Sequence, residues 1–294
     1  MNTLLRGGNP ITFWRYSVFR TGLPAAFAAA GLLLFALPGS VGSAAAASAP
    51  LPNLMAAVGD SITRAYDVDA SCVLSDCPEE SWSTGIAPAV DSEYQRILAA
   101  NSAISGKEVN DASSGAKMVD LDDQVRAAAS QGVQYLTVEM GANDLCVSSV
   151  SDMTPTSAFE SEFRTALTDF TTADPSAHIF VASIPNIYQL WQVEESNATA
   201  EAEWNILGIC PDMLSSSANG AQRAQIVAQE HADNQALATV CAEFSQCKFD
   251  NDAVYNVAFT TSDVSNVDYF HPSLAGQALL AATAWSAGYW PGTK

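Results

Sequence analysis

Short apolar runs alternate with helical stretches along most of this chain. The apolar runs predict buried strands at residues 54–58, 109–112, 135–140, 179–184 and 254–259. Helical patterns separate them near residues 91–100, 120–130, 156–171 and 220–244, and a last helix is expected after His271, with Pro272 in its first turn. This alternation predicts an α/β fold, a three-layer α/β/α sandwich around a parallel sheet of about five strands.

Two stretches lack a clear strand or helix pattern. Residues 67–83 are polar and contain cysteines, so we expect a long loop beside the first strand. Residues 190–217 are expected to form a second long insertion, with Trp191 and Trp204. Long loops at the rim of a sheet usually shape substrate access.

The first 49 residues differ from the rest in composition. Arg6, Arg15 and Arg20 precede an apolar run over residues 23–37, and small residues follow over 43–49, with no acidic residue in the whole stretch. This order is typical of a secretory signal peptide, and the apolar run is short for a membrane span. We expect a signal peptide over residues 1–49, a single secreted domain over 50–294, and, as the alternative, an uncleaved membrane anchor.

Acidic residues dominate the charge of the chain. The formal net charge is −20, and removing the three arginines of the signal peptide changes it to −23. Binding to nucleic acid needs clustered Lys and Arg, so nucleic acid is excluded as a partner. The charge gives no attraction to an anionic membrane, so we expect at most transient contact with lipid aggregates. We also expect the protein to be a monomer.

All six cysteines follow the signal peptide, and an even count in a secreted chain suggests disulfides. Sequence proximity favours Cys72–Cys77 and Cys241–Cys247, which leaves Cys146–Cys210. A zinc site is the alternative, but paired Cys-x-x-Cys spacing is missing. The sequence also has no paired-histidine helix motif and no Asp-x-Asp-x-Asp-Gly calcium loop, so neither a metal nor a cofactor is expected.

Three candidate site residues follow predicted strand ends: Ser61, Gly115 and Asn143. In parallel sheets ligands bind at the carboxyl ends of the strands, so these positions should converge on one rim. Taken singly, Ser61 could be a helix N-cap, Gly115 a simple turn and Asn143 part of an Asn/Gly loop. Together they could supply a nucleophilic hydroxyl and hydrogen-bond donors for an oxyanion.

A base for Ser61 is available near the carboxyl end of the chain. His271 can accept the serine proton through one ring nitrogen, and Asp268 is close enough in sequence to fix the tautomer through the other. His178 and His231 are better explained as structural or solvent-facing residues. The sequence around Ser61 is not Gly-x-Ser-x-Gly, so an α/β-hydrolase elbow is not expected.

The chain resembles the SGNH (GDSL) hydrolase family in four ordered blocks. These are Gly59-Asp60-Ser61-Ile62, Gly115, Gly141-x-Asn143-Asp144 and Asp268-x-x-His271, with Ile62 in place of the usual Leu. The resemblance implies a flavodoxin-like α/β/α fold, a catalytic triad of Ser61, His271 and Asp268, and an oxyanion hole formed by Ser61, Gly115 and Asn143. Residues 81–85, Ser-Trp-Ser-Thr-Gly, also resemble the secreted actinobacterial lipase and phospholipase B-like branch.

The resemblance implies hydrolysis of a carboxylic ester through an acyl-enzyme, with a lipid or phospholipid ester as the expected substrate. Trp82, Tyr188, Leu190 and Trp191 favour a lipid if they lie in rim loops, although they could equally be core residues. The alternatives are a carbohydrate acetylesterase, a lipid acyltransferase and a non-catalytic binding protein on the same fold.

Overall fold

The computed structural model describes residues 49–293. The expected signal peptide therefore lies outside the described residues, apart from Ala49. No helix in the described part of the chain combines the length and apolarity that crossing a bilayer requires.

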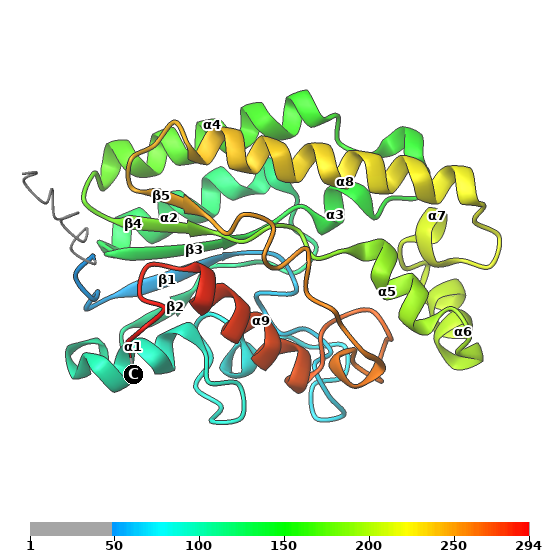
Figure 1. Ribbon diagram of the computed structural model, residues 1–294, viewed down its shortest axis with the longest axis horizontal. Helices are drawn as coiled ribbons and strands as arrows, with labels where there is room; N and C mark the ends of the chain where they lie inside the picture. The colour runs from blue at the N-terminus through cyan, green and yellow to red at the C-terminus, as the bar shows by residue number, and fades with distance from the viewer. Residues whose placement is uncertain (1–48, 294) are drawn as a thin grey trace, which may run out of the picture. The chain divides into compact units, whose positions relative to one another are not determined.

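The centre of the fold is a parallel sheet with the strand order β2-β1-β3-β4-β5 (Figure 1). The strands are β1 Met55–Gly59, β2 Glu108–Asn110, β3 Tyr135–Glu139, β4 His178–Val181 and β5 Cys247–Phe249. Every residue of β1 and β3 is buried, as their apolar sequences predict. The expected α/β class and five-stranded parallel sheet are confirmed.

Helices cover both faces of the sheet (Figure 1). One layer contains α2 Leu121–Gln131, α4 Thr156–Ala173 and α8 Gly220–Cys241, which pack against one another in that order. The other contains α1 Glu93–Ala100 and α9 Leu274–Ala287. In α4 the buried aromatic residues recur at helical spacing, which places one face of the helix on the core: Phe159, Phe163 and Phe170.

Several short elements connect these strands and helices. They are η1 Pro78–Glu80, η2 Ser102–Ile104, η3 Met118–Asp120, α3 Ala142–Leu145, η4 Val150–Asp152 and η5 Thr261–Asp263. Apart from η1, the expected loop over residues 67–83 contains no helix or strand.

The fifth strand is not at residues 254–259, so that expectation was wrong. There the chain turns, with the Asn256 N–H donating to Asp252 and the Val257 N–H to Val254. The actual edge strand, β5, is half-buried, three residues long and pairs only with β4. Val254 and Val257 are buried in the turn, and their apolar side chains gave the segment the sequence pattern of a strand.

The second insertion was also wrongly expected to be a loop. It forms α5 Ile187–Glu194, α6 Ala198–Leu207 and α7 Pro211–Leu214. Asn186 and Asn197 cap α5 and α6 with their side chains, and Gly208 ends α6 in the left-handed conformation. These capping residues were visible in the sequence and could have predicted the helices.

Three disulfides join all six cysteines: Cys72–Cys77, Cys146–Cys210 and Cys241–Cys247. The pairing is the one that sequence proximity favours. Cys146–Cys210 spans 64 positions and ties the end of α3 to the start of α7, whereas Cys241–Cys247 spans only 6. In each of these two pairs one cysteine is buried and the other is half-buried.

Replacing Cys146 and Cys210 together by alanine is expected to lower the free energy of unfolding by about 4 kcal/mol, because a long loop of the unfolded chain loses its constraint. The double alanine variant of Cys241 and Cys247 is a control of similar burial, and its short loop predicts a loss of about 2 kcal/mol. Denaturant unfolding of the three proteins measures the difference. An equal or larger loss in the short-loop variant would contradict the prediction.

Candidate active site

Ser61 follows β1 in a turn that only glycine can begin. Gly59 has a φ of 148°, and a Cβ at this position would lie 2.1 Å from the carbonyl oxygen of Glu139. The close approach of β1 to β3 therefore excludes a side chain at this point. The turn that follows leaves Ser61 8 % exposed, at the floor of a cleft.

A continuous chain of hydrogen bonds connects Ser61, His271 and Asp268. His271 Nε2 lies 2.8 Å from Ser61 Oγ, and His271 Nδ1 lies 2.5 Å from Asp268 Oδ2. Burial acts to raise the pKa of Asp268, but hydrogen bonds from the His271 ring and from the backbone N–H groups of Phe270 and His271 outweigh it and leave the pKa lowered. An ionised Asp268 accepts a hydrogen bond from the Nδ1–H group, which leaves Nε2 without a proton and free to accept a hydrogen bond from the Ser61 hydroxyl.

The imidazole also packs against two aromatic rings. The Tyr66 ring centroid lies 5.2 Å from that of His271, and the Phe270 ring stands edge-on at 5.0 Å. Tyr269, between Asp268 and His271, has a φ of 57°, which tightens the loop so that both side chains point inward. The Trp204 indole N–H donates to the Tyr269 carbonyl at 3.0 Å, so α6 supports this loop.

The same cleft contains the other two residues expected at the rim. It has a volume of about 420 Å³ and is lined by Ser61, Gly115, Asn143 and His271, among others. Gly115 has a φ of 82°, which favours glycine. Within residues 49–293 the backbone N–H groups of Ser61 and Gly115 donate to no backbone acceptor.

Two oxygen atoms contact the side-chain amide of Asn143 and orient it. Its side-chain nitrogen lies 3.0 Å from the Ala116 carbonyl oxygen and 3.4 Å from Asp60 Oδ2. The first contact fixes the direction of the amide, and the second is long for a hydrogen bond. The amide is therefore held weakly on one side.

Sequence reasoning missed a pair of buried carboxyl groups under the site, Asp60 and Glu139. Burial raises the pKa of Asp60 to about 6, and it raises the pKa of Glu139 well above its ordinary value, with the charge of Asp60 adding to the effect. Neither Glu139 oxygen has a hydrogen-bond partner among the described residues. A glutamate inside the apolar run 135–140 was the signal that could have revealed this pair.

The other residues considered from the sequence lie elsewhere or differ from expectation. His178 begins β4, and His231 contacts the Tyr255 hydroxyl at 3.1 Å. Trp82 is a core residue rather than a rim residue, since it is 1 % exposed and its indole N–H donates to Thr63. Tyr188 stacks on Trp191 with ring centroids 5.3 Å apart.

A small apolar recess of about 50 Å³ adjoins the cleft, and Phe270 lines both. Ile187 lines the recess and begins α5, and its backbone N–H donates to Glu230 of α8 at 3.0 Å. Burial raises the pKa of Glu230 to about 8, with a smaller contribution from the charge of Asp233. Glu230 thus anchors the wall of the recess as a buried carboxyl group.

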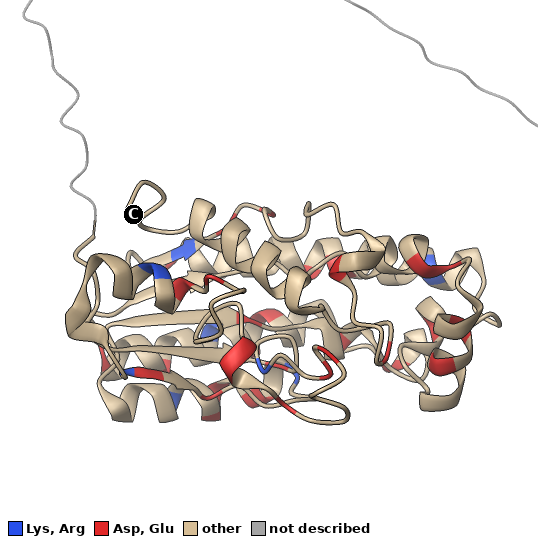
Figure 2. Ribbon diagram, turned by 90° about the horizontal axis from the view of Figure 1, so that it is seen from below, with Lys and Arg blue, Asp and Glu red and all other residues tan. Residues whose placement is uncertain are grey.

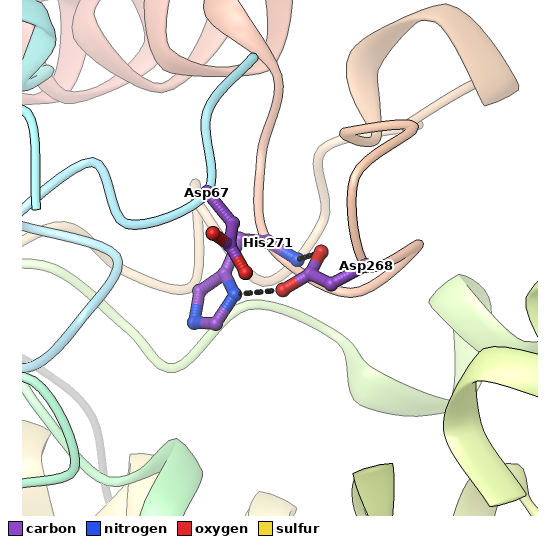
Figure 3. A group of neighbouring side chains, drawn as sticks. All are labelled: Asp67, Asp268 and His271. Carbon is purple, nitrogen blue, oxygen red and sulfur yellow. Dashed lines mark hydrogen bonds and ion pairs between the residues drawn. The ribbon is translucent and has the colours of Figure 1, made fainter. Parts of the chain in front are cut away.

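Among the residues that the structure describes, two groups of side chains could offer three metal ligands each. One consists of Asp67, Asp268 and His271 (Figure 3). Both ring nitrogens of this histidine already have hydrogen-bond partners, so a metal would have to displace one of them. In the other group, Asp69, Cys72 and Glu80, the cysteine sulfur is in a disulfide and is not available as a thiolate.

Residues 57–279 match the model of the family described as GDSL-like Lipase/Acylhydrolase. The match spans all four sequence blocks, and the chain belongs to this family. The protein is therefore a carboxylic ester hydrolase.

Several solved structures are similar to this chain at low sequence identity. A protein described as a GDSL-like lipase from Parabacteroides merdae is 17% identical, with a TM-score of 0.51, over 82% of this chain and 96% of that chain. An extracellular lipase from Streptomyces rimosus is 18% identical, with a TM-score of 0.44, over 80% of this chain and 99% of its own. A family 3 carbohydrate esterase from Clostridium thermocellum is 15% identical, with a TM-score of 0.41, over 80% and 94%. No curated protein matches the chain.

EDTA is expected to leave the hydrolysis of a soluble short-chain ester unchanged, because the hydrogen-bonded arrangement around His271 needs no metal ion to transfer a proton. Initial rates before and after dialysis against the chelator measure this. Loss of the activity, restored by one divalent cation only, would contradict the prediction and point to Asp67, Asp268 and His271.

Glu230→Gln is expected to stabilise the protein more at about pH 8.5 than at about pH 5. The folded-state pKa of about 8 lies above the ordinary value of 4.5, so the folded protein holds a proton that the unfolded chain releases. The stabilisation from this group is complete below about pH 4.5 and is lost as the pH rises to about 8. Glutamine keeps the acceptor for Ile187 and does not titrate.

Thermal unfolding at several pH values, compared with the unchanged protein, measures the effect. Glu195→Gln is the control, because its side chain is exposed to solvent. A difference in Tm between the Glu230→Gln variant and the unchanged protein that stays constant with pH would contradict the prediction.

Proposed function

We propose that the protein is a secreted serine esterase that hydrolyses lipid or phospholipid esters with Ser61 as nucleophile, His271 as general base and Asp268 as its orienting partner. The observation that carries the proposal is the hydrogen-bond chain from Ser61 Oγ through His271 to Asp268. A weak nucleophile needs such a base, and the base needs a third group that fixes its tautomer.

The reaction proceeds through an acyl-enzyme. Ser61 Oγ attacks the ester carbonyl carbon while His271 Nε2 takes the hydroxyl proton, and Asp268 stays ionised and stabilises the imidazolium. His271 then protonates the leaving alcohol as the carbon–oxygen bond breaks. Water, activated by the same nitrogen, attacks the acyl-enzyme and releases the acid.

The charge that develops on the carbonyl oxygen is bound by donors on three segments. These are the N–H groups of Ser61 and Gly115, which donate to no backbone acceptor within residues 49–293, and the Asn143 amide. The long Asp60 contact leaves one amide hydrogen available to turn toward the oxyanion. One donor of this kind typically contributes about 10²–10³ in rate.

A lipid substrate is favoured over a sugar ester by the lining of the cleft. Leu74, Leu207, Ile209 and Phe270 line it together with the reacting residues. Apolar walls bind acyl chains and offer few partners to sugar hydroxyls. Residues 81–85 support a relationship to the secreted actinobacterial lipase and phospholipase B-like branch.

Export is supported by two features. Residues 1–49 have the composition of a signal peptide. The remaining chain, proposed as one hydrolase domain over residues 50–294, contains three disulfides, which persist in oxidising compartments. We propose that this domain acts as a monomer.

Ser61→Ala and His271→Ala are each expected to lower kcat by about 10⁴-fold or more, and Asp268→Asn by less, because it orients rather than transfers the proton. Ser61→Ala should also abolish labelling by a fluorophosphonate. His231→Ala is the control and should retain activity. Labelling that maps to a different serine would overturn the assignment of the nucleophile.

The substrate class is tested by rates on p-nitrophenyl esters from acetyl to palmitoyl, on phosphatidylcholine and on acetylated xylan. A lipolytic enzyme prefers the longer chains and the phospholipid. A preference for acetylated xylan would instead identify a carbohydrate acetylesterase.

A further inference from the structure

Exposed apolar side chains gather at two places beside the active-site cleft. Among the described residues, the exposed large hydrophobic side chains include two consecutive pairs, Val73-Leu74 and Ile206-Leu207. One member of each pair, Leu74 or Leu207, lines the cleft that contains Ser61. The two pairs therefore flank the entrance through which a substrate must pass.

The first pair is displayed by a braced loop. The Cys72–Cys77 disulfide closes the loop, and Cys72 is buried with Ala65 and Val68 in a small core of its own. Leu74 has a φ of 52°, and its backbone N–H donates to Asp67 Oδ1. Holding a leucine in the left-handed conformation costs energy, and the disulfide and the Asp67 contact offset that cost. The loop thus holds the side chains of Val73 and Leu74 in solvent, where they gain no free energy from apolar burial.

The second pair is the last turn of α6. Ile206 is 77 % exposed and Leu207 49 % exposed, and Gly208 ends the helix directly after them. The other side of this helix is fixed, because Trp204 is buried and donates to Tyr269 in the catalytic loop. Movement of the exposed pair relative to the catalytic residues is thereby restricted.

The charges around these pairs argue for an uncharged surface as partner. Neither the segment 65–95 nor the segment 165–222, which carry the two pairs, contains a Lys or Arg. Asp and Glu are spread over the described ribbon, as Figure 2 shows. An anionic partner would be repelled, whereas a zwitterionic lipid surface offers apolar volume without net charge.

We propose that Val73-Leu74 and Ile206-Leu207 form an interfacial binding surface that inserts into zwitterionic lipid aggregates and places the cleft over them. The proposal rests on the proposed lipolytic function. It adds a binding surface to the catalytic site, because Val73 and Ile206 do not line the cleft.

The test measures binding without turnover. The Ser61→Ala variant is sedimented with phosphatidylcholine vesicles. The same measurement is made on variants that carry Ser61→Ala together with Val73→Ser, Ile206→Ser or both. Each substitution is expected to weaken partitioning about tenfold, because one aliphatic side chain no longer transfers from water to lipid. Vesicles that contain phosphatidylglycerol should bind less than pure phosphatidylcholine.

Ile86→Ser is the matched control, since Ile86 is 55 % exposed, Val73 is 56 % exposed, and Ile86 lies outside the cleft lining. It should leave partitioning unchanged. Equal loss in the control, no loss in the Val73 and Ile206 variants, or stronger binding to the anionic vesicles would overturn the proposal. A dimer in light scattering that only Val73→Ser or Ile206→Ser abolishes would assign the surface to self-association instead.

Hydrolysis of a soluble short ester by proteins with Ser61 intact separates this proposal from the proposed function. The Val73 and Ile206 variants should keep their kcat/KM on that ester, while their rate on phosphatidylcholine vesicles falls about tenfold. An unchanged protein that binds vesicles but hydrolyses no lipid ester would contradict the proposed substrate and leave the binding surface standing.

Discussion

The register between β1 and β3 determines where the candidate active site of this protein is assembled. Gly59 pairs with Glu139 at the carboxyl ends of the two strands, and no side chain fits at Gly59 against the neighbouring backbone. Because the strands are parallel and in this register, Ser61 and Asn143 leave the sheet at the same edge. A shift of one residue would reverse the side of the sheet that each residue faces and would separate the hydroxyl from the amide.

Buried carboxyl groups near this edge of the sheet differ in the direction of their pKa shifts. Asp268 keeps a lowered pKa because hydrogen bonds outweigh its burial, whereas burial raises the pKa of Asp60 and of Glu139. The site therefore contains an ionised carboxylate, Asp268, that accepts a hydrogen bond from His271. It also contains Asp60, which contacts Asn143 and takes up a proton more readily. Two environments near the edge of the sheet thus shift the pKa of the same functional group in opposite directions.

Much of the architecture could be predicted from the sequence because buried parallel strands and capped helices leave strong local patterns. β1, β3 and β4 are apolar runs, and the blocks around Ser61, Asn143 and His271 follow strand or loop ends. β5 escaped prediction because an edge strand of three half-buried residues has no such pattern. Glu139 in an apolar run indicates a buried carboxyl group, but its pairing with Asp60 depends on which strands are neighbours. The burial of Trp82 depends on contacts between distant segments, and local sequence does not contain that information.

The contact between Ser61 and His271 joins residues that are 210 positions apart in the chain. Ser61 gains this hydrogen-bond partner only after the segment before α9 has docked. A chain that is still being synthesised therefore has no assembled serine–histidine contact. The long separation in sequence thus delays the assembly of the candidate active site until nearly the whole chain has folded.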